Sequence, residues 1–361
     1  MKSSNSAKII EHPVKLQLSA NDKVEQTMPK QKRLNLKTMS PIIALVLILV
    51  ATAILSPGFL QLKMVDGHLY GSLIDIIHRG MPTALVALGM AVVIGTGGID
   101  LSVGAITAIA GAVMAVLLST SDLSPIYILL IALASGLAFG LWNGLLVAYV
   151  GMQPIVATLI LMVAGRGIAQ MITGGQIVTF HSDFFNLLGN EFIWLLPTRV
   201  WILLGVALLV AIVIRKTALG LFLEAVGANP TSSRLVGIES KKIITLAYVF
   251  SGLCSALAGV ILAADIRGAD ANNAGLWLEL DAILAVVIAG ASLAGGRIYL
   301  GLTLIGVLII QTLTTAILTS GIPAQYNLIV KATIILLVLL IQSSTTQDKF
   351  KQLFKKNKES A

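Results

Sequence analysis

Charged side chains are scarce in this sequence of 361 residues, where Asp, Glu, Lys and Arg together make up only 12%. Soluble globular proteins carry about 25% charged residues. The residues Ala, Val, Ile, Leu, Met, Phe, Trp, Tyr and Cys contribute 57%, and the mean hydropathy is +0.93. This composition excludes a typical water-soluble enzyme. It also excludes a disordered chain, because disorder requires low hydrophobicity.

Cysteine and the motifs of catalysis are equally scarce. The single Cys254 lies in an apolar run, so the sequence allows neither an intrachain disulfide nor a cysteine-based metal cluster. The dipeptide Gly-Lys occurs nowhere, which excludes a phosphate-binding P-loop. The motifs HExxH, CxxC and GxSxG are missing, and the four histidines are scattered. The sequence therefore predicts no catalytic residue, no metal site and no cofactor.

Long apolar runs dominate what is present, and a membrane-spanning helix needs about 20 apolar residues. The sequence predicts an all-α, polytopic membrane bundle of about ten spanning helices, with eight or nine as the alternative count. The predicted spans are 41–60, 80–95, 101–118, 126–150, 155–172, 199–214, 243–263, 281–294, 298–318 and 326–342. The runs 80–95, 199–214 and 281–294 are short, so each is tilted, extended into its flanks or broken.

The positions of the basic residues predict the orientation. With ten spans and the N-terminus inside, the cytoplasmic segments carry 19 Lys and Arg residues and the opposite segments carry 4, as the positive-inside rule requires. We therefore expect a mobile cytoplasmic tail at 1–40, a membrane domain at 41–342 with a cytoplasmic loop at 215–242, and a basic cytoplasmic tail at 343–361. The first tail has no apolar h-region and does not form a cleavable signal peptide.

The net charge of +8 has two interpretations. A basic chain can bind nucleic acid, but no basic patch here is interleaved with aromatic residues. The Lys and Arg residues instead flank hydrophobic runs, where they set topology and face lipid headgroups. We expect membrane lipid, and no nucleic acid, as a partner.

Small residues recur at intervals of four along two of the predicted spans. Gly136, Gly140 and Gly144 form one such series, and Ser251, Ser255 and Gly259 form another. In membranes, small residues let helix backbones approach closely, so tight packing is expected, with a helix break along a pathway as the alternative. The tetrapeptide AVVI also occurs twice, at 91–94 and 285–288, each time before a Gly-rich stretch. Transporters are often built from internal repeats.

The cytoplasmic loop 215–242 contains two helix signals. Apolar residues fall at i, i+3, i+4 and i+7 before Gly227, namely Leu219, Phe222, Leu223 and Val226. Asn229 followed by Pro230 then predicts an N-cap and a first helical residue, for a second helix at 231–236. The stripe is either an interfacial helix on lipid headgroups or a docking element that fills a groove on a cytosolic partner.

The segment EAVGANPTSSRLVGI, at 224–238, resembles the ATPase-coupling loop of the ribose-type sugar ABC importer permeases. Further matches to that family lie at 89–106, 140–167 and 264–290. The last two, with GGQIVTF, are similar to a permease subunit of the bacterial galactofuranose importer. The resemblance implies that the ATPase contact is carried by Glu224, Ala225, Val226, Gly227, Ala228, Asn229 and Pro230.

The resemblance also implies an assembly. It predicts a fold like the type II importer of vitamin B12, in the inner membrane of a bacterium with both termini cytoplasmic. The partners it implies are cytosolic ABC ATPases, a periplasmic sugar-binding protein and a second, related permease. This chain would then be the permease subunit that moves a sugar, galactofuranose or another monosaccharide, by alternating access, and would not itself be an enzyme.

Polar residues within or between spans are the candidates for the path. Asp100 lies at the break between the second and third spans, and Arg166 lies within the fifth. Each either forms a structural ion pair or lines a polar sugar path. The polar segment 264–281 adds Asn272 and Asn273 as gate residues. Its charged residues are either a solvated loop or the contact with the binding protein, namely Asp265, Arg267, Asp270 and Glu279.

Two rival functions remain open from the sequence. An ion-coupled carrier would transport without any ATPase and would stop when an ionophore collapses the gradient. A membrane scaffold or receptor would show no flux. An ATPase that co-purifies through the loop 215–242 would separate the importer from both.

Overall fold

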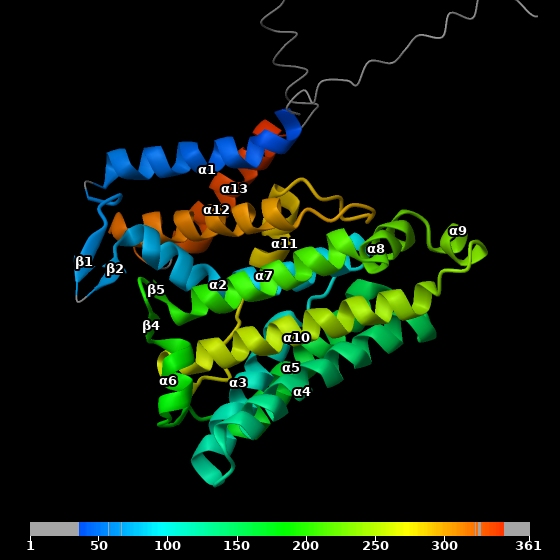
Figure 1. The fold of residues 1–361 in the computed structure, drawn as a ribbon, viewed down its shortest axis with the longest axis horizontal. Helices are drawn as coiled ribbons and strands as arrows, with labels where there is room; N and C mark the ends of the chain where they lie inside the picture. Colours follow the sequence, from blue (N-terminus) through cyan, green and yellow to red (C-terminus); the bar gives the residue numbers. More distant parts are fainter. Residues whose placement is uncertain (1–35, 57, 66, 322, 324–325, 343–361) are drawn as a thin grey trace, which may run out of the picture. The chain divides into compact units, whose positions relative to one another are not determined.

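The computed structural model describes residues 36–342, apart from positions 57, 66, 322 and 324–325. Most of these residues are helical, as predicted, and three small antiparallel sheets join the loops (Figure 1). The expectation of a purely α-helical fold is corrected to this extent. The strands form in loops, where backbone N–H and C=O groups that no helix satisfies must find other partners.

The helices and strands follow one another without long structureless connections. The helices are α1 (Leu36–Leu55), α2 (Ser72–Gly95), α3 (Val103–Thr120), α4 (Pro125–Leu145) with a π-helical extension (Leu146–Val150), α5 (Pro154–Thr173), α6 (Asp183–Gly189), α7 (Thr198–Lys216), α8 (Ala218–Ala228), α9 (Pro230–Leu235), α10 (Ser240–Ile266), α11 (Leu278–Ile288), α12 (Leu300–Thr319) and α13 (Asn327–Gln342). The strands are β1 (Lys63–Val65), β2 (His68–Tyr70), β3 (Val178–Thr179), β4 (Phe192–Ile193), β5 (Leu196–Pro197) and β6 (Gly268–Ala269). Strand β1 pairs with β2, β3 with β6, and β4 with β5.

Each predicted span contains a helix, but seven helices in the described residues are long and apolar enough to cross a membrane: α2, α3, α4 with its extension, α5, α7, α10 and α12. Two of the predicted short runs extend into their flanks, since α2 has 24 residues and α7 has 19. The third is broken, because α11 ends at Ile288 after 11 residues. Helix α1 begins at Leu36, within the predicted tail 1–40, whose residues before 36 lie outside the described part, as does the tail 343–361.

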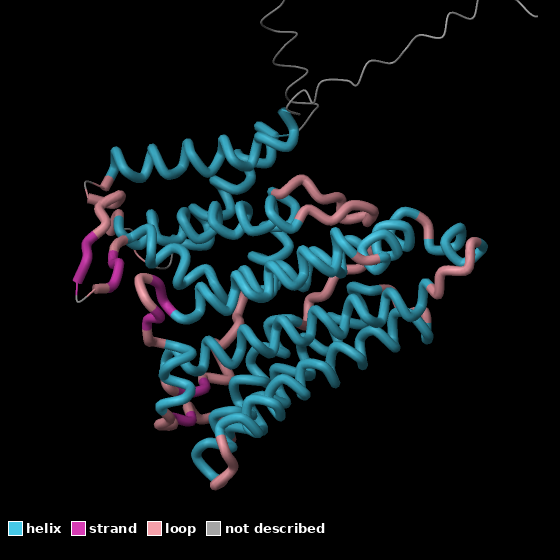
Figure 2. Tube along the Cα trace, in the orientation of Figure 1, coloured by secondary structure: helices cyan, strands magenta, loops and turns pink. Residues whose placement is uncertain are grey.

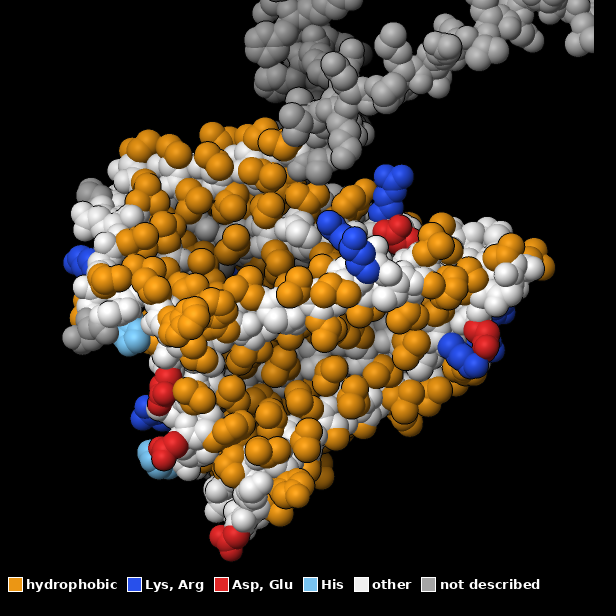
Figure 3. Space-filling view, in the orientation of Figure 1, with side chains coloured by type: hydrophobic (Ala, Val, Ile, Leu, Met, Phe, Trp, Pro, Cys, Tyr) orange, Lys and Arg blue, Asp and Glu red, His pale blue; other side chains and the backbone are white. Residues whose placement is uncertain are grey.

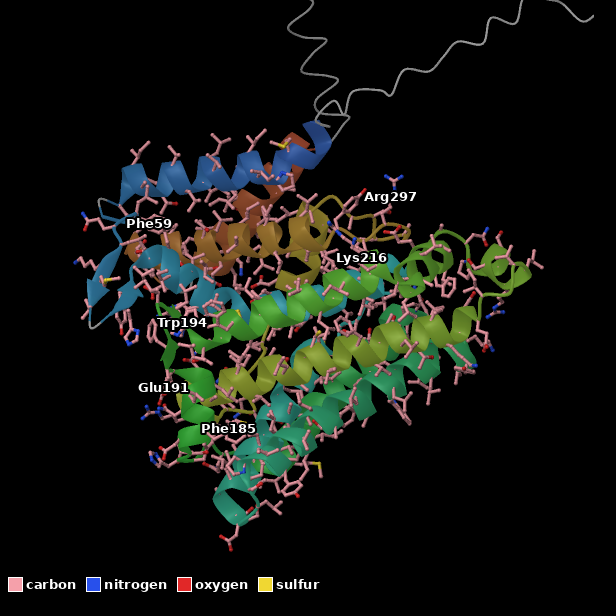
Figure 4. The ribbon with its side chains drawn as sticks, viewed as in Figure 1. Phe59, Phe185, Glu191, Trp194, Lys216 and Arg297 are labelled. Carbon is pink, nitrogen blue, oxygen red and sulfur yellow. The ribbon has the colours of Figure 1, made fainter. Side chains whose placement is uncertain are left out.

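The loops and short elements gather at two opposite ends of the long helices. The sheets and α6 lie at one end, which we call the hairpin end (Figure 2). Helices α8 and α9 lie at the other, which we call the elbow end (Figure 1). Trp194 and Glu191 mark the hairpin end, and Lys216 and Arg297 mark the elbow end (Figure 4). This separation agrees with the predicted alternation of loops between the two sides of a membrane.

Helix α2 forms the centre of the bundle. Its hydrophobic segment is 83% buried, whereas the segments of α4, α5 and α7 are only 22–28% buried. The exposed side chains of those outer helices are largely apolar, and hydrophobic atoms cover most of the face between the two ends (Figure 3). Such a surface is stable only against hydrocarbon or another protein, which agrees with a multi-pass membrane protein.

The predicted small-residue series are packing surfaces. A Cβ atom added to Gly136 would collide with the backbone oxygen of Gly252, and one added to Gly140 would collide with that of Tyr248. Helices α4 and α10 therefore approach so closely that only glycine fits between them. Two turns further along α10, Gly259 lies equally close to the backbone of Thr107 on α3.

Candidate functional site

Helices α8 and α9 correspond to the two helices predicted in the loop 215–242, and we call residues 218–236 the elbow. The Thr217 hydroxyl accepts a hydrogen bond from the backbone N–H of Leu219 and caps α8. At the bend, Asn229 Oδ1 accepts from the backbone N–H of Ser232 at 2.9 Å, and Pro230 is the first residue of α9. This N-cap and its proline confirm the prediction from Asn-Pro. The bounds differ by one residue: α8 continues to Ala228, and α9 runs from Pro230 to Leu235.

The apolar stripe of α8 faces this chain's own core. Leu223 and Val226 are buried in the cluster that surrounds α2, with exposed fractions of 7% and 0%. The interpretation of the stripe as a surface that enters a groove on a partner is therefore wrong for these two residues. The large apolar side chains that the elbow exposes are Leu219, which belongs to the predicted stripe, and Leu221, Leu235 and Val236.

Helix α8 also contacts the turns that end α2 and precede α12. Glu224 Oε1 accepts a hydrogen bond from the backbone N–H of Ile298 at 3.1 Å. Gly227 lies directly on the backbone oxygen of Gly95 and the backbone nitrogen of Gly296, where a Cβ would collide. Gly296 in turn donates to Gly95 across 3.0 Å. One short helix thus contacts two turns that are distant in sequence.

These two turns follow the repeated tetrapeptide. The first AVVI segment, 91–94, lies at the end of α2, and the second, 285–288, ends α11. Each is followed by a Gly-rich turn, and the two turns meet through the bond from Gly296 to Gly95. Each AVVI segment thus ends a helix, and the Gly-rich stretch that follows it contacts α8.

A second group of polar residues lies toward the hairpin end, between α5 and the segment 270–279. Arg166 Nη1 donates to the backbone oxygen atoms of Ala271 and Ala274. Gln170, one helical turn further along α5, donates to Asn272 Oδ1 at 2.8 Å. We call the whole group the polar cluster, and it comprises Arg166, Gln170, Asp270, Asn272, Asn273 and Glu279.

Asp270 organises the loop of the polar cluster. Its Oδ1 accepts from the backbone N–H groups of Asn272 and Asn273 at 3.0 and 3.2 Å, and its Oδ2 accepts from the Asn273 side chain at 2.7 Å. The Asn273 side-chain bond is the largest cause that lowers the pKa of Asp270 in this loop, and the backbone bonds and the charge of Arg166 act in the same direction. Asp270 is therefore held as a carboxylate that shapes the loop.

Glu279 is the most enclosed member of the polar cluster. The residue is only 7% exposed, and its buried Oε2 has no hydrogen-bond partner among the described residues. Gly104 of α3 lies so close that a Cβ there would collide with this oxygen. A buried carboxylate oxygen without a donor is costly, which makes it a natural acceptor for a ligand hydroxyl.

The other predicted site residues lie apart from the polar cluster. Asp100 is fully buried near the end of α2, where Oδ1 accepts from the hydroxyl of Ser102 at 2.6 Å and Oδ2 accepts from that of Ser251 at 2.9 Å. Asn143 donates to Ser102 at 2.8 Å and extends the network to α4. None of the ion pairs found in the described residues includes Asp100. The carboxylate of Asp100 is thus bound by hydroxyl groups, and its place on the sugar path stays a prediction.

Asp265 and Arg267 connect the end of α10 to α7 and α6 at the hairpin end. Asp265 pairs with Arg199, which is 1% exposed and also donates to the backbone oxygen of Gly189. The charge of Arg199 therefore lies inside the protein. Arg267 donates from Nε and Nη2 to Asn186 Oδ1 at 3.1 and 2.8 Å, and its side chain stays exposed.

The sequence comparisons agree with this architecture. Residues 72–339, most of the chain, match the family described as the permease component of the branched-chain amino acid transport system. This chain belongs to that permease family. The galactofuranose transporter permease protein YtfT of Escherichia coli is 53% identical to this permease over 319 residues, which cover 88% of this chain and 93% of that protein.

Two further relatives are similar over the same region. The fructose import permease protein FruF of Bifidobacterium longum is 38% identical over 84% of this chain and 86% of its own length. The ribose import permease protein RbsC of Escherichia coli is 37% identical over 84% of this chain and 92% of its own length. The predicted resemblance of this permease to ribose-type and galactofuranose permeases is confirmed.

Gln170 is the member of the polar cluster that sequence reasoning missed. A signal for it was present, because Gln170 follows Arg166 by four residues and residues four apart share a helix face. In the part of the permease that the structure describes, no group of three or more His, Cys, Asp or Glu residues could hold a metal ion. The chemistry that the polar cluster offers is hydrogen bonding, which suits a hydroxyl-rich solute.

Proposed function

We propose that this permease moves a monosaccharide such as galactofuranose through the bacterial inner membrane, driven by ATP hydrolysis on separate cytosolic subunits. A second, related permease would complete the path, and a periplasmic sugar-binding protein would deliver the substrate. We further propose a type II fold like that of the vitamin B12 importer, with the elbow end and both termini in the cytoplasm. The observation that carries the proposal is the contact of α8 with the turns after α2 and before α12.

The elbow would act as a lever. ATPase subunits that close on ATP would push on the exposed residues of the elbow, with Leu235 and Val236, which are 85% and 77% exposed, as the apolar contacts. Because Glu224 and Gly227 lie directly on the two Gly-rich turns, displacement of α8 would be passed to the ends of α2 and α12. Within the segment from Glu224 to Pro230, the first residues would transmit the movement, and the exposed Ala228, Asn229 and Pro230 would contact the ATPase beside Leu235 and Val236.

The polar cluster would line or gate the sugar path. Its amides and carboxylates supply donors and acceptors for hydroxyl groups, and Glu279 offers a buried acceptor without a partner. A hollow between α3 and α10, lined mostly by small residues, opens beside Asp270 and Asn273. Arg267, exposed at the hairpin end, would contact the binding protein, and Asp265 would support that surface through Arg199.

Reconstituted uptake tests the proposal. Vesicles that contain this permease, its partner permease and the ATPase should accumulate labelled galactofuranose only with the binding protein and internal ATP, and an ionophore should not stop the uptake. Uptake without an ATPase that collapses with the ionophore would establish an ion-coupled carrier instead. Absence of flux with any of a panel of pentoses and hexoses would contradict transport altogether.

Paired substitutions test the elbow in the same vesicles. Leu235→Asp with Val236→Asp should abolish co-purification of the ATPase and ATP-driven uptake, because both side chains are exposed and the fold does not depend on them. Ile266→Asp, on a residue that is 59% exposed at the other end of α10, is the control and should retain the ATPase. Retention of the ATPase by the double variant would contradict the proposed docking surface.

A further inference from the structure

An apolar groove lies between α7 and α10, the two helices at the front of the view in Figure 1. Both helices pack on α2, and Val92 of α2 lines the groove between them. Leu209 of α7 and Phe250 of α10 contribute to the walls, and every lining side chain is apolar. The groove has a volume of about 660 Å³, including its open side.

The surroundings of the groove indicate what fills it. The outer surface of α7 exposes apolar side chains, with Leu208 63% and Leu209 58% exposed, and in a membrane protein such a surface contacts acyl chains. The groove extends along α10 from Ile243 to Phe250, about 10 Å at the helical rise. A wholly apolar groove along the helix direction suits a hydrocarbon chain.

Positively charged side chains at one end of the groove would favour a ligand with an anionic group. Ile214 lines the groove at the elbow end, and the next two residues of α7, Arg215 and Lys216, are exposed. Neither enters an ion pair found in the described residues. Unpaired cations at the end of a spanning helix attract anionic lipid headgroups. Figure 4 places Lys216 at this end of α7, beside the start of α8.

We propose that the groove between α7 and α10 binds one acyl chain of an anionic phospholipid, whose phosphate group is held by Arg215 and Lys216. The groove is also lined by Leu219 and Leu223 of α8, so the acyl chain would contact the elbow itself. That consequence rests on the proposed function. The binding of the lipid to the groove does not depend on the proposed function, because it can be measured without transport.

Native mass spectrometry of the full chain, titrated with dioleoyl phosphatidylglycerol or dioleoyl phosphatidylcholine, tests the site. Leu209 lines the groove and Leu208 does not, although they are neighbours of similar exposure. Leu209→Trp should therefore lose one tightly bound phosphatidylglycerol per chain, whereas Leu208→Trp should keep it. Equal binding of phosphatidylglycerol by the two variants would overturn the proposal.

The headgroup contact has its own test. Arg215→Gln with Lys216→Gln should weaken phosphatidylglycerol binding by about fivefold for each charge removed, and should leave phosphatidylcholine binding unchanged. Lys242→Gln, at an exposed lysine already paired with Glu239, is the control and should have little effect. A wild-type chain that bound both lipids equally would overturn the assignment of an anionic lipid.

Photo-crosslinking distinguishes a lipid in the groove from a protein helix in the groove. A diazirine amino acid close to leucine in size, in place of Leu209 in the assembled complex within cell membranes, leaves the groove open and should yield an adduct with the mass of a phospholipid. A crosslink to another polypeptide at this position would overturn the proposal, because it would show that a protein helix fills the groove.

Discussion

Glu224 and Ile298 are 74 residues apart in the sequence, yet the carboxylate of the first accepts a hydrogen bond from the backbone N–H of the second. The bond spans 3.1 Å and joins α8 to the turn that precedes α12. A hydrogen bond to an ionised carboxylate is stronger than one between neutral groups. Movement of α8 is therefore expected to move this turn as well.

Removal of this bond should uncouple ATP hydrolysis from uptake. Glu224→Ala leaves the N–H of Ile298 without its acceptor, whereas Glu224→Gln retains a neutral acceptor of the same shape. We expect uptake per ATP hydrolysed in reconstituted vesicles to fall about tenfold in the alanine variant, from the loss of roughly 1–2 kcal/mol of contact. In the glutamine variant, uptake per ATP hydrolysed should fall less than in the alanine variant. Equal uptake per ATP in both variants and the wild type would show that the bond transmits nothing.

The close approach of Gly227 to Gly95 predicts a second effect. A methyl group at Gly227 would collide with the backbone oxygen of Gly95, whereas one at Gly301 of α12 would meet no atom within 4 Å. Gly227→Ala should therefore separate α8 from the end of α2 and lower ATP-driven uptake severalfold, and Gly301→Ala should not. Membrane insertion, measured by the yield of folded complex, should be the same in both variants. Full uptake by Gly227→Ala would contradict a tight lever contact.

The elbow was predictable because its signals are local. Asn229 and Pro230 define an N-cap and a first turn wherever they occur at a helix start, and the spacing of the apolar residues predicts α8. The direction of the stripe was not predictable, because an apolar face has the same sequence whether it packs on its own core or on a partner. Only the position of α2 decides that Leu223 and Val226 are internal.

The sequence identified which polar residues could form the candidate site, but not which of them lie together in the fold. Arg166 and the polar segment 264–281 were identified from the cost of charges within or beside spans. Which of them meet depends on how α5, α10 and α11 pack, and this separates Asp265 and Arg267 from the polar cluster. Asp100 was expected to form an ion pair or to line the path, but its carboxylate accepts from Ser102 in the same turn and from Ser251 of α10.

Gln170 should affect the handling of the sugar rather than the ATPase cycle. Gln170→Leu removes the donor to Asn272 and places an apolar group in the polar cluster. Loss of one or two hydrogen bonds to a hydroxyl should lower uptake at subsaturating sugar by about tenfold, while ATPase activity without sugar stays unchanged. Met171→Leu, at a neighbour that is 82% exposed, is the control. A Gln170→Leu variant with normal uptake would remove this residue from the proposed path.

Asp100 should contribute to stability more than to transport. Asp100→Ala removes the acceptor of the Ser102 and Ser251 hydroxyls and of the Ser102 backbone N–H, and leaves three buried donors without it. Each buried donor that loses its partner costs about 1–3 kcal/mol, so the melting temperature of the purified permease should fall by several degrees. Asp122→Ala, at an exposed aspartate between α3 and α4, should leave it unchanged. If Asp100→Ala instead abolished uptake and kept the wild-type melting temperature, Asp100 would belong to the path, because a purely structural carboxylate cannot be lost without loss of stability.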